Sequence, residues 1–483
     1  MAETVVQEHM SGRPRRQGVL PYQVEVTDKS DGLTSRAGLP LVVETMRALG
    51  IAQAVSEHMK LQQREGGLTD CQKLESVVLL MAAGGNCYDD MRVLQADEGL
   101  QRLIGYSLPS PDAVRAFANA FHDETLVDQA KDKRPEGTVA YIPSESELLA
   151  GLAAVNVALC QAVAARGKGT RATLDHDATI QESRKQQALL HYKGGRGYQP
   201  SCVYFAEQDL IIGDEYRDGN VPAGMDNLPL IRRAFASLPP TIVARFFRAD
   251  SACYEQSVLK WLADEHRPSG PMGPIGFSIS ADMTPELRQA CEAVAVEQWE
   301  LVEERANETL YCADVEFAPG DWPKKAEPLR FVAVRIQKKQ GALFASGADT
   351  RYLAVVSNRR SMKPADLLRW HWEKAGTIEH VHDVTKNELG ASTPPSKYFG
   401  ANAAWYRMSL LTYNVLSAMK SMALPPSLGS ARPKKLRFCL FNLAGKISSH
   451  AGSVVLCISK VAEQIVGLIA ARAKLLELLA LPA

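Results

Sequence analysis

The spacing of apolar residues changes at position 171, and this change constrains the fold more than any other feature of the sequence. Between 37 and 165, apolar residues recur at helical intervals and their runs stop at glycines, which predicts a series of helices. Beyond 171, short β-rich runs are separated by turn residues, at 173–179, 202–205, 210–216 and 242–249. Helical patterns at 225–238 and 254–265 precede and follow the fourth run. This order favours a mixed α/β sheet.

Four further boundaries follow from pattern changes along the chain. Residues 1–165 are predicted to form an N-terminal helical region, and 166–266 the first part of the sheet. A start rich in Gly and Pro, followed by β-prone runs, indicates an inserted β-rich subdomain at 267–356. Helical pattern resumes over 357–425, and a last helical region covers 426–483. We therefore expect a core interrupted by an insertion.

Composition excludes several classes of protein. An apolar fraction of 46% and a charged fraction of 23% are typical of globular proteins, so the chain is not disordered or fibrous. Apolar runs are far shorter than the ~20 residues of a membrane span, and the first 16 residues lack the apolar segment of a secretory signal. The nine cysteines contain no Cys-x-x-Cys pair, which favours neither a disulfide framework nor a zinc ribbon. We expect a reducing cytoplasm.

Net charge is uninformative, because 55 basic residues cancel 55 acidic ones. Binding of nucleic acid would have to come from local basic patches, one of which lies at 168–200. Within it, Lys193 and Arg196 occupy a Gly-rich turn where the backbone can approach a phosphate. A plain hairpin turn explains the same residues equally well.

Two acids end apolar strand patterns. Alternation places Asp175 and Asp177 on one face of the run 173–179, and Asp250 closes the run that begins at 242. A carboxylate at the end of a buried strand needs a cation or a donor nearby. If the two strands adjoin, a divalent metal between the acids makes their proximity tolerable. Acids at strand ends are otherwise caps or turn formers, so the pattern leaves both interpretations open.

A third acid lies on a predicted helix. Glu379 and Lys386 are seven residues apart, or two helical turns, so they can share a face as metal ligand and phosphate contact. On spacing alone, an ordinary surface helix explains them better.

Residue type alone suggests two other sites. A zinc site at His371, His380, His382 and Asp383 is not favoured, because the last two histidines point in different directions on a helix. Cys253 has no histidine partner evident in the sequence, which favours a packed small residue over a nucleophile.

Short motifs spread along nearly the whole chain resemble those of one known family. They are Gly32–Leu39, Leu174–Thr179, Tyr192–Pro200, Arg217–Asn220, Arg248–Ser251, the helix of Glu379, and Phe399–Ala403 with the run to Asn414. Each is weak alone, but their order and spacing together are specific. The chain resembles the DDE transposases of bacterial insertion sequences, in the superfamily of insertion sequence four and most nearly the family of insertion sequence thirteen-eighty.

The resemblance implies an α/β fold, an RNase H-like catalytic core interrupted by a β-rich insertion and flanked by N-terminal and C-terminal helical regions. It implies that the catalytic residues and metal ligands are Asp177, Asp250 and Glu379, with Asp175 a supporting acid or a rival for the first position. The DNA-binding residues that it implies are Lys386, Lys374, Lys193 and Arg196. Residues 1–165 would bind DNA ends, and 166–266 and 357–425 would form the two parts of the core.

The activity implied by the resemblance is cleavage at the ends of a mobile element and joining of those ends to target DNA by transesterification. Two Mg²⁺ ions would support it, with Mn²⁺ able to substitute, and three carboxylates suffice because Mg²⁺ keeps some of its own waters. The implied partners are double-stranded DNA, as terminal inverted repeats and target, and a second copy of the chain in a synaptic homodimer. The implied location is the bacterial cytoplasm, in association with the nucleoid.

One departure from the family pattern is visible. The family helix follows Tyr-x2-Arg-x3-Glu-x6-Lys, and here the four positions hold Trp372, Ala375, Glu379 and Lys386. Lys374 lies beside the missing arginine, but a lysine lacks the bidentate fork that arginine offers a phosphate. The departure keeps two alternatives open, a catalytically impaired DNA-binding protein derived from a transposase and a nuclease of the same fold.

Overall fold

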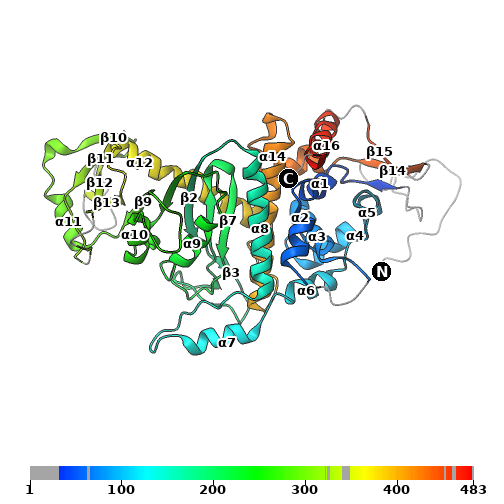
Figure 1. Cartoon of the computed structure of the whole chain (residues 1–483), viewed down its shortest axis with the longest axis horizontal. Helices are drawn as coiled ribbons and strands as arrows, with labels where there is room; N and C mark the ends of the chain where they lie inside the picture. Colours follow the sequence, from blue (N-terminus) through cyan, green and yellow to red (C-terminus); the bar gives the residue numbers. More distant parts are fainter. Residues whose placement is uncertain are drawn as a thin grey trace, which may run out of the picture.

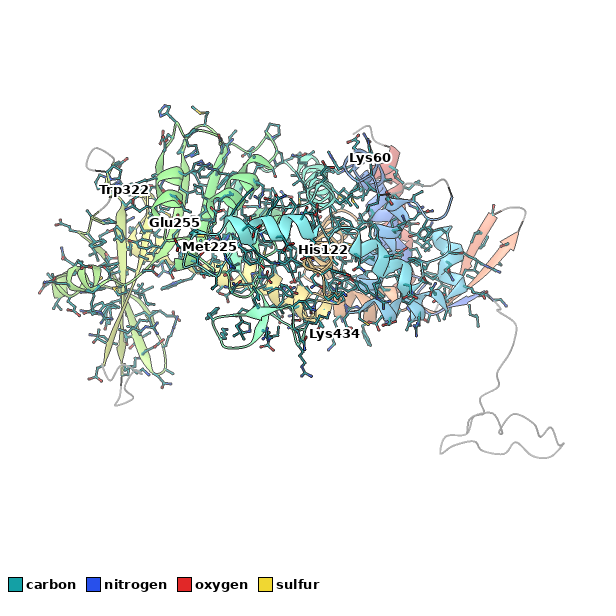
Figure 2. All side chains as sticks on the ribbon, turned by 90° about the horizontal axis from the view of Figure 1, so that it is seen from below. Lys60, His122, Met225, Glu255, Trp322 and Lys434 are labelled. Atoms are coloured by element: carbon teal, nitrogen blue, oxygen red, sulfur yellow. The ribbon has the colours of Figure 1, made fainter. Side chains whose placement is uncertain are left out.

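The structure is a computed structural model that describes residues 32–61, 66–320, 322–323, 327–339, 349–450, 453–459 and 464–480. The molecule is elongated, with a large sheet toward one end and a helical body toward the other (Figure 1). Two long helices, α8 (Glu147–Arg166) and α14 (Phe399–Met422), stand between these parts. Seen from below, Trp322 lies at the sheet end and Lys60 at the helical end (Figure 2).

The core of the sheet is mixed, with antiparallel and parallel strand pairs. Five strands form it: β2 (Arg171–Ala178), β6 (Ser201–Phe205), β7 (Leu210–Glu215), β8 (Ala244–Ala249) and β9 (Ile275–Ala281). They lie in the order β9-β8-β2-β6-β7. Strands β2, β6 and β7 form an antiparallel meander. Strand β8 pairs with β2 in parallel, and β9 pairs with β8 in parallel. Crossover helices α9 (Leu228–Ala236) and α10 (Gln256–Ala263) precede and follow β8. The prediction of a mixed α/β fold with an RNase H-like core is confirmed.

The β-rich segment does not form a sheet of its own. Its strands β10 (Glu300–Glu304), β11 (Glu308–Val315), β12 (Arg330–Lys338) and β13 (Thr350–Ser357) continue the core sheet to nine strands through antiparallel pairing of β13 with β9. Helix α11 (Pro285–Glu292) lies between β9 and β10 in sequence. Strand β9, the fifth strand of the core, falls inside the range 267–356, because its apolar pattern follows the Gly- and Pro-rich loop directly.

The N-terminal region is helical, as its periodicity indicates. Its other helices are α1 (Pro40–Ala48), α2 (Ile51–His58), α3 (Asp70–Ala83), α4 (Met91–Gln95), α5 (Glu98–Ile104), α6 (Pro111–Asn119) and α7 (Glu124–Lys133). Side-chain caps explain where several begin: Thr69 forms a capping box with Gln72 at α3, and Ser146 caps α8. Helix α8 is long and apolar enough to cross a membrane by length and composition, but it packs against α2, α14 and β7 as a core helix does.

The C-terminal part combines helices with a hairpin that the helical prediction for 426–483 did not include. Strands β14 (Gly445–His450) and β15 (Ser453–Cys457) form a hairpin, and β14 also pairs with the short β1 (Leu33–Thr34), so the first described residues join a C-terminal hairpin in one small sheet. The helices here are α12 (Pro364–Trp372), α13 (Ile378–Glu388), α15 (Pro433–Leu436) and α16 (Gln464–Ala480).

Helix α14 closes the open edge of the sheet. Strand β7 is an edge strand of the sheet. The backbone N–H and C=O groups on the outer side of a buried edge strand need hydrogen-bond partners from other elements. Asn414 on α14 accepts from the Ile211 N–H at 2.7 Å and donates to the Ile211 carbonyl at 2.8 Å, and Asn156 on α8 donates to the same carbonyl. The sheet, α8 and α14 are therefore held as one unit behind the acids.

Candidate active site

Asp177 and Asp250 lie at the carboxyl ends of adjacent parallel strands. His176 on β2 is in register with Ala249 on β8, and the two aspartates are the next residues of their strands. Asp250 Oδ1 accepts the Ala252 N–H at 3.1 Å and so caps the short helix Ser251–Cys253, while Asp177 Oδ1 accepts the Ala178 N–H at 2.9 Å. The parallel pairing that the sequence left conditional therefore brings the two acids to the same edge of the sheet.

The pKa of Asp177 is raised to about 6, chiefly by burial; the charges of Asp250 and Glu379 also raise it, and the charge of Lys374 opposes them. The Lys374 ammonium lies 3.9 Å from Asp177 Oδ2. The charges of Asp250 and Glu379 therefore both act on Asp177.

Glu379 lies in the first turn of α13 and is exposed. The helix begins after a break at Thr377, whose backbone is not helical, and α13 packs on β2. A carboxylate in the first turn of a helix is stabilised by the helix dipole. Glu379 therefore lies at the N-terminal end of α13, and its charge acts on Asp177.

Asp175 is engaged in a buried ion pair. Arg248 Nε donates to Asp175 Oδ1 at 2.7 Å and Nη2 donates to Oδ2 at 3.0 Å, with both side chains at most 2% exposed. The Thr377 hydroxyl donates to the same carboxylate at 2.5 Å. Arg248 also donates to the Trp370 carbonyl at 2.6 Å and to Glu373 at 2.7 Å. Asp175 therefore ties β2 and β8 to the segment that leads into the helix of Glu379, which favours the supporting role over the rival one.

The four predicted basic residues lie in different surroundings. Burial lowers the pKa of Lys386 on α13, and the nearby charge of Lys193 lowers it further. Lys193 lies in the turn between β4 (Leu189–Leu190) and β5 (Arg196–Tyr198), which form a small sheet with β3 (Gln181–Glu182). Arg196 donates to the Ala188 carbonyl at 2.8 Å and to the Gln186 carbonyl, so its guanidinium is used on its own hairpin. The fold thus brings Lys374 and Lys386 near Asp177 and Lys193 near Lys386, while Arg196 supports the turn.

A buried histidine behind the strand acids was not identified from the sequence. The His176 ring lies between Ser201 Oγ, 2.7 Å from Nε2, and Cys253 Sγ, 3.1 Å from Nδ1. Burial lowers the pKa of His176 to about 3 and raises that of the Cys253 thiol well above its usual value. The thiol is therefore protonated and the ring is neutral. Cys253 does have a histidine partner, and the contact anchors the turn that carries Asp250.

The histidines of the considered zinc site do not come together. His371 lies between Ser278 and Ser280 of β9, at 2.7 and 3.1 Å. His380 is exposed on α13, whereas His382 is buried. Across the part of the chain that the structure describes, no three His, Cys, Asp or Glu side chains are grouped closely enough to hold a metal ion.

His382 faces Asp177 without bonding to it. Its Nε2 lies 3.8 Å from Asp177 Oδ2, and neither ring nitrogen has a hydrogen-bond partner. Burial lowers the pKa of His382 to about 3, with Lys386 and Lys374 contributing, so the ring is neutral. The sequence offered one signal for it, its position one helical turn after Glu379.

Comparison with known proteins identifies the family. The family model described as transposase DDE domain group 1 matches residues 18–478. The chain belongs to this family of DDE transposases.

A solved structure similar to this DDE transposase is the cryo-EM structure of the piggyBac transposase synaptic complex with hairpin DNA. The two are 11% identical, with a TM-score of 0.39, over 78% of this chain and 73% of that one. No curated protein sequence matches the chain significantly. DDE transposases as a family use divalent metal ions.

Proposed function

We propose that the protein cuts the ends of an insertion sequence and joins them to target DNA by metal-dependent phosphoryl transfer. The observation that carries the proposal is the placement of Asp177 and Asp250 at the ends of neighbouring parallel strands, with Glu379 near enough to raise the pKa of Asp177. Membership of the family supports the reaction class, and the motif order supports its assignment to insertion sequences of the thirteen-eighty type.

The donor set fits a divalent cation. Asp177, Asp250 and Glu379 offer carboxylate oxygens, and their mutual repulsion at a partly buried site is relieved by a cation held among them. Two Mg²⁺ ions, replaceable by Mn²⁺, would activate an attacking water or 3′-hydroxyl and stabilise the leaving oxygen. Glu379 is exposed in the first turn of α13 and would complete the set.

Basic residues around the acids would hold the DNA. The charge of Lys193 is close enough to lower the pKa of Lys386, and neither lysine forms an ion pair with a described residue. A phosphate between them relieves that repulsion. Lys374 would balance the charge of Asp177 and contact the DNA end, and Arg196 would shape the hairpin that presents Lys193.

Each part of the chain would have its own role in the reaction. Residues 1–165 would bind terminal inverted repeats, 166–266 and 357–425 would form the catalytic core, 267–356 would be the insertion, and 426–483 the C-terminal region. Residues 1–31, with the basic cluster at 13–16, lie outside the described residues. A homodimer would pair the two DNA ends on the bacterial nucleoid.

The test is cleavage and strand transfer on a labelled duplex that carries the element's own ends, in Mg²⁺. Wild type is compared with Asp250→Asn and Glu379→Gln, and with Asp366→Asn as a control at an exposed acid in the first turn of α12. Loss of both reactions in the first two variants, with DNA binding and the control intact, supports the proposal. Binding without cleavage by wild type in Mg²⁺ and Mn²⁺ refutes it.

One observation favours a second candidate, a DNA-binding protein without catalysis. Ala375 is exposed where the family motif has arginine, and no other arginine takes its place in the motif. The same assay separates the candidates, and cleavage without joining would identify a nuclease.

A further inference from the structure

Helix α16 has two apolar faces, and only one of them is covered. On one face the helix packs against α1, and the residues that it buries are Leu468, Ala471 and Leu475. On the other face, Val466, Ile469 and Leu476 are 71, 62 and 68% exposed. A helix that is apolar on both faces is typical of the inside of an assembly, and exposed apolar patches mark interaction sites. Among the described residues, nothing covers the second face.

The exposed apolar residues repeat at the interval of a coiled coil. Val466, Ile469, Ala473 and Leu476 are exposed, at intervals of three, four and three residues. These are the intervals between positions a and d of a heptad, which form one apolar seam along a helix. In Figure 1, α16 lies at the outside of the helical body, on the other side of α8 and α14 from the sheet. The seam is therefore of the kind that pairs with another helix.

The charges beside the seam fit a second copy of the same helix. With Val466 at position a, Arg472 takes position g and Glu477 takes position e, on opposite edges of the seam. In a parallel pair of helices, position g of one helix faces position e in the next heptad of the other. Arg472 would thus meet Glu477 of the partner subunit, and a two-fold axis repeats the contact. An antiparallel pair faces g with g and e with e, which offers these charges no opposite partner.

Both charges are available for such contacts. Glu477 is exposed and forms no ion pair with a described residue. Arg472 donates through Nε to Glu44 of α1 at 2.8 Å, and its side chain is still 59% exposed. Since a guanidinium carries five N–H donors, Arg472 can keep Glu44 and bind a second carboxylate through its Nη groups.

We infer that α16 of one copy packs in parallel against α16 of a second copy, through the seam Val466, Ile469, Ala473 and Leu476. This contact deepens the proposed function and rests on it in one respect, because the homodimer that it joins would pair two DNA ends. Helices of 17 residues are about 25 Å long, so the pair buries less than the about 1,600 Å² of a standard interface. Without DNA, the copies should therefore associate reversibly.

Sedimentation velocity of the full chain without DNA, over a wide range of concentrations, measures this association. Wild type is compared with Ile469→Glu, Leu476→Glu and the matched control Val139→Glu, which adds the same charge at a loop valine that is 70% exposed. All three residues are exposed in the single chain, so each variant should fold, which circular dichroism checks. Wild type and the control should dimerise. Both α16 variants should dimerise at least about tenfold more weakly, because each would bury a carboxylate in the seam.

Two further variants test the charged edges. Glu477→Lys sets two cations against each other across the parallel pair and should weaken dimerisation several-fold. Lys474→Glu reverses a charge at position b, away from the seam, and should leave dimerisation unchanged.

Cross-linking measures the direction of the helices. Val466→Cys places the thiols of two copies side by side in a parallel pair, but about 20 Å apart in an antiparallel pair. A short bismaleimide should therefore link Val466→Cys to itself. Wild type, with its nine native cysteines, and Val139→Cys give the background.

Three results would overturn the inference. They are a wild type that stays monomeric at every concentration, dimers that Ile469→Glu and Leu476→Glu retain, and dimers that Val466→Cys does not link above background. None of them bears on cleavage, because the protein is tested without DNA. Failure of the proposed function is a separate result, namely no cleavage of labelled DNA ends by a wild type that dimerises through α16.

Discussion

Replacing Asp175 by asparagine should destabilise the catalytic core, because it leaves the Arg248 guanidinium buried without its carboxylate. Both side chains are at most 2% exposed, and breaking a buried pair from one side typically costs about 3–5 kcal/mol. Arg248 keeps its bonds to Glu373 and to the Trp370 carbonyl, so the lower end, about 3 kcal/mol, is expected. The damage should centre on the start of α13, because the Thr377 hydroxyl donates to the same carboxylate.

Hydrogen–deuterium exchange with mass spectrometry measures this effect locally, which suits a long chain that need not unfold in one step. Peptides from β2, β8 and residues 377–388 should exchange faster in Asp175→Asn, while peptides from α1 to α6 should not change.

The matched comparison is Asp177→Asn, on the same strand two residues later. Burial raises the pKa of Asp177 from 3.8 to about 6, so removal of its charge in EDTA should stabilise the core by up to about 3 kcal/mol. Effects of the same sign in the two variants, or no change in exchange for Asp175→Asn, would refute the assignment of a supporting role to Asp175 and a metal-binding role to Asp177.

Three further predictions concern stability and DNA binding. Burial raises the pKa of Asp218 to about 7, so the folded protein binds the carboxyl proton more tightly than the unfolded chain does. The free energy of unfolding should therefore fall by up to about 4 kcal/mol as the pH rises from about 4 to 7. Asp218→Asn should remove that decline, which thermal unfolding at pH 5 and pH 8 measures. Lys386→Gln should weaken binding of DNA ends and reduce the slope of log affinity against log salt by about one unit, which filter binding at several salt concentrations measures. Ala375→Arg should tighten end binding and raise that slope by about one unit, since the exposed position can supply a new phosphate contact; an unchanged slope would contradict it.

The strand acids could be predicted because strand geometry is local. Two-residue alternation places Asp175 and Asp177 on one face, and an apolar run that ends in a carboxylate marks Asp250. Their proximity needed the parallel pairing of β2 with β8, which lies between residues about seventy apart and leaves no local pattern. Glu379 could be placed only by resemblance, since a glutamate in the first turn of a helix is common.

The supporting contacts could not be predicted, because each joins residues distant in sequence. Arg248 reaches Asp175 across 73 residues, and Cys253 reaches His176 across 77. His382 is visible in sequence as the residue one turn after Glu379, but only its burial without a partner distinguishes it from His380. The continuation of the core sheet by β10–β13 also could not be predicted, because a β-prone run in the sequence does not indicate which sheet the strand joins.

The most direct test of the central claim exchanges one metal ligand for a softer one. Asp250→Cys places a thiolate where the carboxylate at the end of β8 lies, and thiolates bind Mn²⁺ far better than Mg²⁺. If Asp250 holds the metal, this variant should cleave labelled element ends in Mn²⁺ but not in Mg²⁺, whereas Asp250→Asn should cleave in neither. Equal cleavage by Asp250→Cys in both metals, or none in either while the variant folds and binds DNA, would contradict a metal held by Asp250.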